Sequence, residues 1–196
     1  MAGCGGFAGI GSFWAWGRGG FPSDRQKVAM RVGLGHDTHR LVVGRPLILG
    51  GVRIEHEKGL EGHSDADVVL HAVADALLGA AALGDIGEHF PDTDPRWKDA
   101  DSGRLLADVL AMLAEARWSP VNLDVTIHAE APRLGPHKAA IRANLARCLG
   151  LEEDAVNVKA KTGERVGPIG RGEAISADAV VLLQSARFSV GPGGRG

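Results

Sequence analysis

Hydrophobic residues follow a regular pattern from residue 31 to about residue 186. In VNLDVTIHA, residues 121–129, they alternate strictly, so Leu123, Val125 and Ile127 point to one face, as in a strand with one buried side. Shorter apolar runs bounded by glycine or charged residues predict further strands. The predicted strands are residues 31–35, 47–54 (one strand, or a hairpin around Gly50-Gly51), 121–129, 156–161 and 175–183.

Three segments between these strands carry apolar residues at helical spacing. The first is the run Val68–Leu78, for which Ser64 is a suitable N-cap. Ser102 is a suitable N-cap for the second segment, and the third segment follows Pro136. Strands that alternate with helices predict an α/β (α+β) fold, a single domain with helices packed on a mixed β-sheet. The apolar faces are Leu106, Val109, Leu110 and Leu113 in the second segment, and Ile141, Leu145 and Leu149 in the third.

Both ends of the chain differ from this pattern. Residues 1–29 are rich in glycine and lack the basic start and uninterrupted apolar core of a secretory signal. We expect them to form a disordered extension, or to lie upstream of a true start at Met30. Residues 189–196 are expected to be a disordered tail, which leaves residues 30–188 as the domain.

Composition narrows the class of protein. The chain is 44% hydrophobic and 23% charged, with a net charge of −2 and a pI of about 6.4, which argues against a nucleic-acid binder. No apolar run reaches the roughly 18 residues of a membrane span. Cys4 and Cys148 form no recognised motif, so we expect a reducing, cytoplasmic location, with a plastid as the alternative. Any metal must then be bound by histidines and carboxylates.

A polar cluster follows the first predicted strand, in VGLGHDTHR at residues 32–40. Asp37 and His39 are two residues apart, so in an extended chain both side chains point the same way, as two ligands of one ion do. His71 lies within the apolar run, and Asp75, one turn further on, could hold its imidazole in one tautomer. Three protein ligands leave one tetrahedral position open, and imidazoles favour Zn²⁺ over Mg²⁺. Singly, these residues also fit a polar strand end and a core histidine.

Other segments suggest sites for phosphate and sugar. His63 and Ser64 open the first predicted helix, where free N–H groups suit a phosphate, although plain capping is the alternative. In LGDIGEHFPDTDP, residues 83–95, Asp85, Asp92 and Asp94 could accept hydrogen bonds from sugar hydroxyls; a solvated loop is equally compatible.

Two further segments suit a nucleotide. In AEAPRLGPHK, residues 129–138, exposed backbone could read a base edge while Arg133 meets phosphate. In KAKTGERVGPIGRGE, residues 159–173, cations alternate with glycines around Thr162 and Glu164, which suits a polyphosphate with a divalent ion. It is not a P-loop, and a charged hairpin is the alternative. Together the segments describe a metal site, a diphosphate site and a nucleoside pocket.

Several blocks resemble the 2-C-methyl-D-erythritol 2,4-cyclodiphosphate synthase family. They are RVGLGHDTHRL, GGVRI, KGLEGHSDADVVLHAVADALLGAAALGDIGEHFPDTDP, DVTIHAEAPRLGPH, NVKAKTGE and GRGE, from Arg31 to about Ala186. The resemblance implies a homotrimer around a three-fold axis, with active sites between subunits. It implies conversion of 4-diphosphocytidyl-2-C-methyl-D-erythritol 2-phosphate to the 2,4-cyclodiphosphate and CMP, a phosphorus-oxygen lyase reaction of the non-mevalonate isoprenoid pathway.

The resemblance also implies roles for individual residues. Zinc is bound by Asp37, His39 and His71, and Mg²⁺ or Mn²⁺ on the diphosphate is bound by Glu164. His63 and Thr162 are the catalytic residues that steady the transition-state charge. The substrate-binding residues are Ser64, Asp85, Ile86, Gly87, Phe90, Pro91, Asp92, Thr93 and Asp94, with Ala129, Glu130, Ala131, Pro132, Arg133, Leu134 and Gly135 around cytosine.

The sequence departs from the family pattern in two places. The frequent T-T-T-E run is K-T-G-E here, so Lys161 and Gly163 take the place of threonines that contact the cytidine phosphates. The residues before GRGE are Gly167-Pro168 here. In the family, the arginine matching Arg171 faces a cavity on the trimer axis that can hold an isoprenoid diphosphate. The resemblance thus adds Lys161, Gly163 and Arg171 to the expected binding residues. Two other classes stay open, a zinc-dependent nucleoside-diphosphate hydrolase and a non-catalytic nucleotide-binding or metal-binding module.

Overall fold

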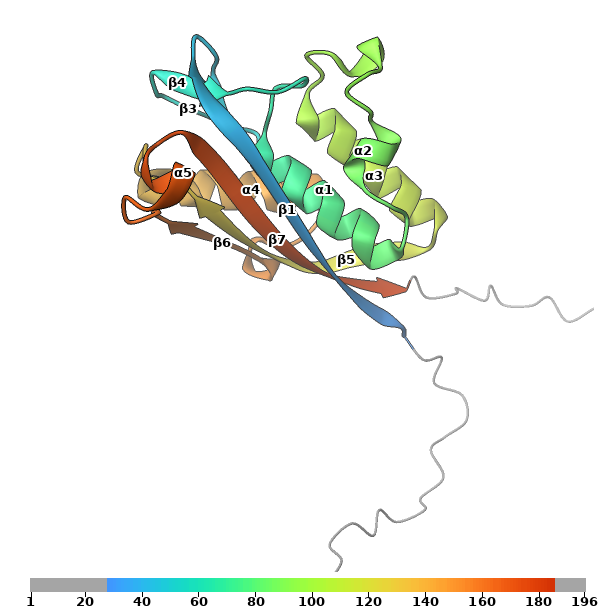
Figure 1. The fold of residues 1–196 in the computed structure, drawn as a ribbon. Coiled ribbons are helices and arrows are strands. Elements are labelled where there is room, and N and C mark those ends of the chain that lie inside the picture. Colours follow the sequence, from blue (N-terminus) through green and yellow to red (C-terminus); the bar gives the residue numbers. More distant parts are fainter. Residues whose placement is uncertain (1–27, 186–196) are drawn as a thin grey trace, which may run out of the picture.

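A five-stranded sheet with helices on one face forms the body of the protein (Figure 1). The structure, a computed structural model, describes residues 28–185; the predicted tail and nearly all of the predicted extension lie outside this range. The sheet order is β4-β1-β7-β5-β6. Among the strand pairs of the described range, only β5–β6 is parallel, which confirms the mixed sheet. The strands are β1 (Met30–Val43), β4 (Lys58–Leu60), β5 (Trp118–His128), β6 (Val156–Lys161) and β7 (Ala174–Ser185).

The predicted hairpin around Gly50-Gly51 is confirmed, as a separate two-stranded sheet of β2 (Leu47–Leu49) and β3 (Val52–Ile54). The three predicted helices are also present. They are α1 (Val68–Ala81), α3 (Ser102–Glu115) and α4 (Lys138–Leu149). The predicted loop 83–95 is partly wrong, because it contains the short helix α2 (Ile86–His89) and meets a 3-10 turn at Pro95–Trp97; the remaining short helices are α5 (Gly167–Gly170) and 3-10 turns at Gly135–His137 and Glu153–Ala155.

Strand β1 is much longer than the predicted 31–35. It pairs with β7 from Met30 to Arg40 and with β4 from Leu41 to Val43. The sequence pattern did not predict this extension, because HDTHR is polar and strand predictions rely on apolar alternation. The pairing with β7 is held by backbone hydrogen bonds, which do not depend on side-chain polarity. The polar cluster therefore lies inside the strand.

Both predicted N-caps are wrong. Asp67 caps α1 by accepting hydrogen bonds from Val69 N and Leu70 N, each at 3.1 Å. The same buried carboxylate also accepts from Gly50 N and Gly51 N, at 2.8 and 2.6 Å. A carboxylate can serve four donors where a hydroxyl cannot, so this residue fastens the hairpin turn to the helix. Ser64 lies upstream of the helix, and α3 begins at Ser102 with Asp101 as its cap.

Helix α1 lies against β1 at backbone distance. A Cβ built on Gly33 would be 2.0 Å from Ala76 O, and one on Gly35 would be 2.0 Å from Ala72 O. The α1 residues nearest these glycines are the buried alanines Ala72, Ala76 and Ala80. This close approach fixes the height of α1 over the strand that carries Asp37.

Within residues 28–185, apolar side chains are exposed on the opposite face of the sheet. Val32 and Leu34 are each 68% exposed, and Val180 on the neighbouring strand is 42% exposed. The apolar strip is unusual for a sheet face left in water. Within residues 28–185, no helix has the length and apolar character needed to cross a membrane.

We predict that Gly35→Ala destabilises the protein by about 3 kcal/mol, because its Cβ has no room against the backbone of α1. The control is Gly79→Ala, in α1 itself, where nothing lies within 4 Å of the added Cβ. Thermal unfolding should show a Tm decrease on the order of 6–12 °C for the first variant and none for the control. Equal Tm values for the two variants would contradict the close packing.

Candidate metal centre and pocket

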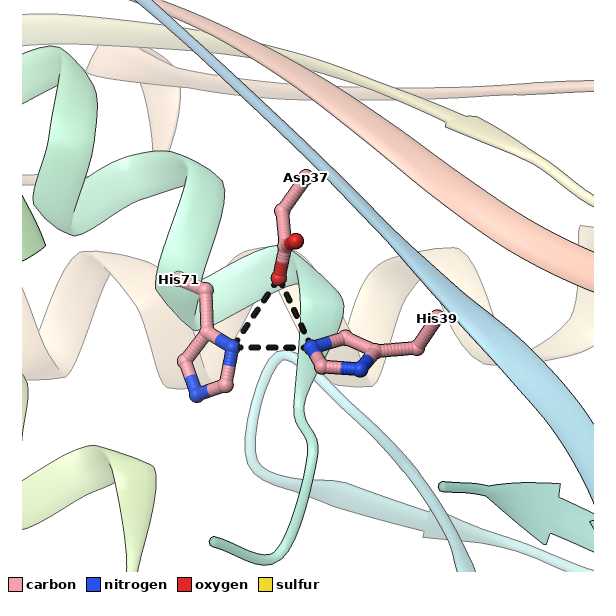
Figure 2. A group of neighbouring side chains, drawn as sticks. All are labelled: Asp37, His39 and His71. Carbon is pink, nitrogen blue, oxygen red and sulfur yellow. Dashed lines mark hydrogen bonds and ion pairs between the residues drawn. The ribbon is translucent and has the colours of Figure 1, made fainter. Parts of the chain in front are cut away.

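Asp37, His39 and His71 converge on one point (Figure 2). Asp37 Oδ2 lies 2.9 Å from His39 Nε2 and 2.9 Å from His71 Nδ1, and the two nitrogens are 3.2 Å apart. The side chains are 13–25% exposed. For a tetrahedral ion with bonds of about 2.1 Å, ligand atoms are roughly 3.4 Å apart. The three atoms are therefore gathered almost as a divalent ion needs them, and two imidazoles with one carboxylate suit such an ion.

The strand and helix determine how these ligands meet. Asp37 and His39 point to the α1 side of β1, the same side as Gly33 and Gly35, because side chains alternate along a strand. His71 comes from the first turn of α1, and its backbone N–H donates to Asp67 O at 3.0 Å. The sequence prediction that these three residues form one cluster agrees with the geometry.

His39 is oriented by the backbone of the loop after β4. Its Nδ1 donates to Glu61 O at 2.7 Å, which leaves Nε2 facing the centre. Gly62 makes room for this arrangement, since a Cβ there would lie 3.1 Å from His39 Cε1 and 2.8 Å from Ala66 Cβ. Arg45 holds the following residues by donating to Gly62 O and Ser64 O, at 3.3 and 2.7 Å.

The prediction that Asp75 holds the His71 ring is wrong. Asp75 Oδ1 instead accepts a hydrogen bond from Ile86 N at 2.8 Å, because α2 folds back over α1. His71 Nε2 lies 2.9 Å from Ser102 Oγ and 3.2 Å from Ser64 Oγ. No pattern in the sequence indicates these contacts, which join His71 in α1 to the first residue of α3 and to the loop before α1.

The surroundings of the ligand cluster favour a charged Asp37 carboxylate beside a protonated His39. Burial opposes charge on Asp37, but hydrogen bonds from His39 and His71 outweigh it and hold the pKa of Asp37 well below its usual range. Burial also opposes charge on His39, yet the hydrogen bond and charge of Asp37 raise its pKa above the usual value. An arriving metal ion must therefore displace a proton from His39.

A cavity of about 310 Å³ opens beside the metal ligands. Six predicted substrate or catalytic residues line it together with His39 and His71. Residues that the sequence analysis missed are Gly62, Trp97 and Leu105; Trp97 contacts Phe90 edge-to-face, with ring centroids 5.0 Å apart. The predicted residues in this cavity are His63, Ser64, Ile86, Gly87, Phe90 and Asp92.

A second cavity, of about 680 Å³, contains most of the predicted nucleotide-binding residues and shares no lining residue with the first. Pro136 and Ala160 also line it, and neither was predicted. The predicted members are Ala129, Glu130, Pro132, Arg133, Leu134, Gly135, Lys161 and Thr162.

Several predicted residues line neither cavity. Asp85 caps α2, and Asp94 caps the Pro95–Trp97 turn and pairs with Arg96. Arg171 pairs with Glu173 at 2.8 Å, and Glu164 accepts from Thr162 Oγ1 at 2.9 Å. His63 and Ser64 do not sit at a helix N-terminus as predicted, because α1 starts only at Val68. The other predicted residues outside the two linings are Pro91, Thr93, Ala131 and Gly163.

We predict that His71→Ala weakens binding of a divalent metal by at least about 100-fold, since loss of a ligand should exceed the 10–100-fold typical of a supporting residue. His36→Ala is the matched control; His36 is on the same strand as Asp37 but bonds Asp178 on the opposite face of the sheet. Metal content after dialysis measures the binding, and circular dichroism shows whether each variant is folded. Full metal occupancy in folded His71→Ala would exclude this centre.

We also predict that metal affinity decreases as the pH falls. The raised pKa keeps His39 protonated to higher pH than an ordinary histidine, so acid increasingly competes with the ion, by up to about tenfold per pH unit for one displaced proton. Calorimetric titrations in buffers of different ionisation enthalpy count the protons released. A pH-independent affinity without proton release would contradict the role of His39.

The sequence and fold have clear counterparts among known proteins. The YgbB family model matches residues 30–184. A Bordetella avium protein named 2-C-methyl-D-erythritol 2,4-cyclodiphosphate synthase is 61% identical over 80% of this chain and 96% of its own. A solved structure of a 2C-methyl-D-erythritol-2,4-cyclodiphosphate synthase in a CDP-bound form is 39% identical over 78% of this chain and 99% of its own, with a TM-score of 0.73. A bifunctional IspDF from Campylobacter jejuni is 42% identical, covering 81% of this chain and 43% of its own, with a TM-score of 0.78. The chain belongs to the YgbB family.

Proposed function

We propose that this protein is a 2-C-methyl-D-erythritol 2,4-cyclodiphosphate synthase, which closes the ring of 4-diphosphocytidyl-2-C-methyl-D-erythritol 2-phosphate and releases CMP. One observation carries the proposal: the Asp37, His39 and His71 centre opens onto a cavity lined by His63 and Ser64, in a chain whose relatives have that name. The bacterial origin of such relatives supports a cytoplasmic location.

We propose Zn²⁺ as the ion of this centre, because three His and Asp ligands with an open position are typical of catalytic zinc. When bound, zinc supplies positive charge that polarises a phosphate oxygen. Asp37, His39 and His71 would hold it. His63, whose Nε2 lies 3.4 Å from Asp94 O, and Ser64 offer hydrogen-bond donors to phosphate oxygens in the same cavity.

The reaction needs positioning more than a base. The attacking group is a phosphate of the substrate itself and is already an anion, so a serine nucleophile or a strong base has no task. Orientation within one molecule can contribute roughly 7–11 kcal/mol. Phe90 and Trp97 form an apolar wall of the cavity, which helps to exclude water. This arrangement fits the assignment to a cyclising lyase.

We propose that the second cavity binds the cytidine nucleotide. The backbone of residues 129–135 and the Arg133 side chain line it, and Lys161 and Thr162 lie at its edge. Glu164 is exposed, has a φ of 49° and accepts from Thr162; a non-glycine residue in this conformation often marks a functional loop. This supports Glu164 as the residue that would bind Mg²⁺ or Mn²⁺ on the diphosphate.

We propose that three copies assemble around an axis facing the side of the sheet opposite α1, with active sites between neighbours. Two observations support this: the apolar strip of Val32, Leu34 and Val180, and the division of the predicted substrate residues between separate cavities. A neighbouring copy can bring the two kinds of cavity together. Binding of an isoprenoid diphosphate on the axis stays a prediction; Arg171 is already paired with Glu173.

The activity is tested by incubating the purified protein with its proposed substrate, with and without a chelator. We expect CMP release that the chelator abolishes, and a cyclic diphosphate by mass and phosphorus NMR. Inorganic phosphate or a linear product would identify a nucleoside-diphosphate hydrolase instead. Cytidine nucleotide binding without CMP release would identify a non-catalytic module.

We predict that His63→Ala lowers kcat by about 100-fold, as expected for loss of one donor to the transition-state charge, while metal content stays at the wild-type level because His63 is not a ligand. His137→Ala, a histidine outside both cavity linings, is the control. An unchanged kcat in His63→Ala would remove this residue from the catalytic group.

A further inference from the structure

His71 must meet two requirements at once if Nδ1 is to bind a metal. A neutral imidazole carries one proton, so Nε2 has to hold it and needs a hydrogen-bond acceptor. Two hydroxyls, Ser102 Oγ at 2.9 Å and Ser64 Oγ at 3.2 Å, face Nε2. A hydroxyl can donate or accept, so these contacts alone do not determine which ring nitrogen is protonated.

Asp65 removes the ambiguity for Ser102. Ser102 Oγ donates to Asp65 Oδ1, and Ser102 N donates to Asp65 Oδ2 at 3.2 Å. A carboxylate only accepts, and a serine hydroxyl has one proton. Because that proton goes to Asp65, the Ser102 oxygen can only accept at His71. The pair therefore requires an N–H at Nε2. Nδ1 lies 2.9 Å from Asp37 Oδ2, so the proton that His71 gives up when a metal binds is the one on Nδ1, and its lone pair then serves the centre.

The pair is held firmly. Ser102 is 1% exposed, and two backbone hydrogen bonds join its loop to the loop of Asp65: Asp65 N to Ala100 O at 3.1 Å, and Asp99 N to His63 O at 2.8 Å. Asp67 N also donates to Asp65 Oδ1, at 3.3 Å. These contacts keep the Ser102 hydroxyl in place as the donor and the Asp65 carboxylate as its acceptor.

Ser64 is left with a different task. Its oxygen accepts from Ala66 N at 3.1 Å, and it lines the cavity beside the metal ligands. Since Ser102 already satisfies the Nε2 proton, Ser64 keeps its own proton for an oxygen in the cavity.

We propose that Asp65 and Ser102 form a lock that fixes the His71 tautomer and so positions Nδ1 to bind the metal. They are positioning residues, because both act through His71. The proposal rests on the metal centre of the proposed function. Partners of this kind typically contribute 10–100-fold to metal affinity.

The test is a double-mutant cycle on zinc affinity, measured by competition with a chromophoric chelator. We expect Ser102→Ala and Asp65→Asn each to weaken zinc binding by about 10–100-fold. The double variant should lose no more than the single variants, because Asp65 acts only through Ser102. Asp101→Asn is the matched control: it makes the same charge change at the same end of α3 and keeps an N-cap.

A second measurement separates a lock from mere support of the fold. In zinc-loaded wild-type protein labelled with ¹⁵N-histidine, the His71 Nε2 proton should exchange slowly with water. It should exchange fast in Asp65→Asn and slowly in Asp101→Asn. Additive losses in the double variant, or wild-type affinity and exchange in both single variants, would overturn the lock. If the wild type binds no zinc, the metal centre fails, and the lock fails with it.

Discussion

The close approach of α1 to β1 is the constraint on which the site depends. Gly33 and Gly35 leave no side chain between strand and helix, so His71 reaches the same point as Asp37 and His39. The two glycines and the two strand ligands, Asp37 and His39, are all odd-numbered. They share one face of β1 because side chains alternate with a period of two. An insertion of one residue between Gly35 and Asp37 would turn both strand ligands to the opposite face while the helix stayed in place.

A second constraint is the convergence of hydrogen bonds on two acids just before α1. Asp67 joins the β2–β3 turn to the helix, and Asp65 joins the loop before α1 to the first residue of α3. Arg45 donates to two carbonyls of the same loop. The loop that carries His63 and Ser64 thus has defined neighbours on each side. These polar contacts have narrow limits of distance and angle, so they define the position of the loop closely.

The sequence predicted most of the fold because alternation and helical spacing report directly on burial. Leu123, Val125 and Ile127 are buried as expected. The metal ligands were also predictable, since Asp37 and His39 share a face by spacing and His71 supplies a third ligand. The family resemblance then implied the same three residues. The N-caps and the partners of His71 were not predictable. Those contacts depend on which loops meet; Ser102 and Asp65 are 37 residues apart, and no periodic pattern records such an encounter.

The origin of the metal ligands also affects how the protein unfolds. His39 and His71 are 32 residues apart and belong to a strand and a helix that meet only in the folded chain. An unfolded chain has no such centre, so an ion bound to the native state favours folding by mass action. Apparent thermal stability should then depend on the free metal concentration, and the same ion that serves the active site would act as a crosslink between the sheet and its covering helix.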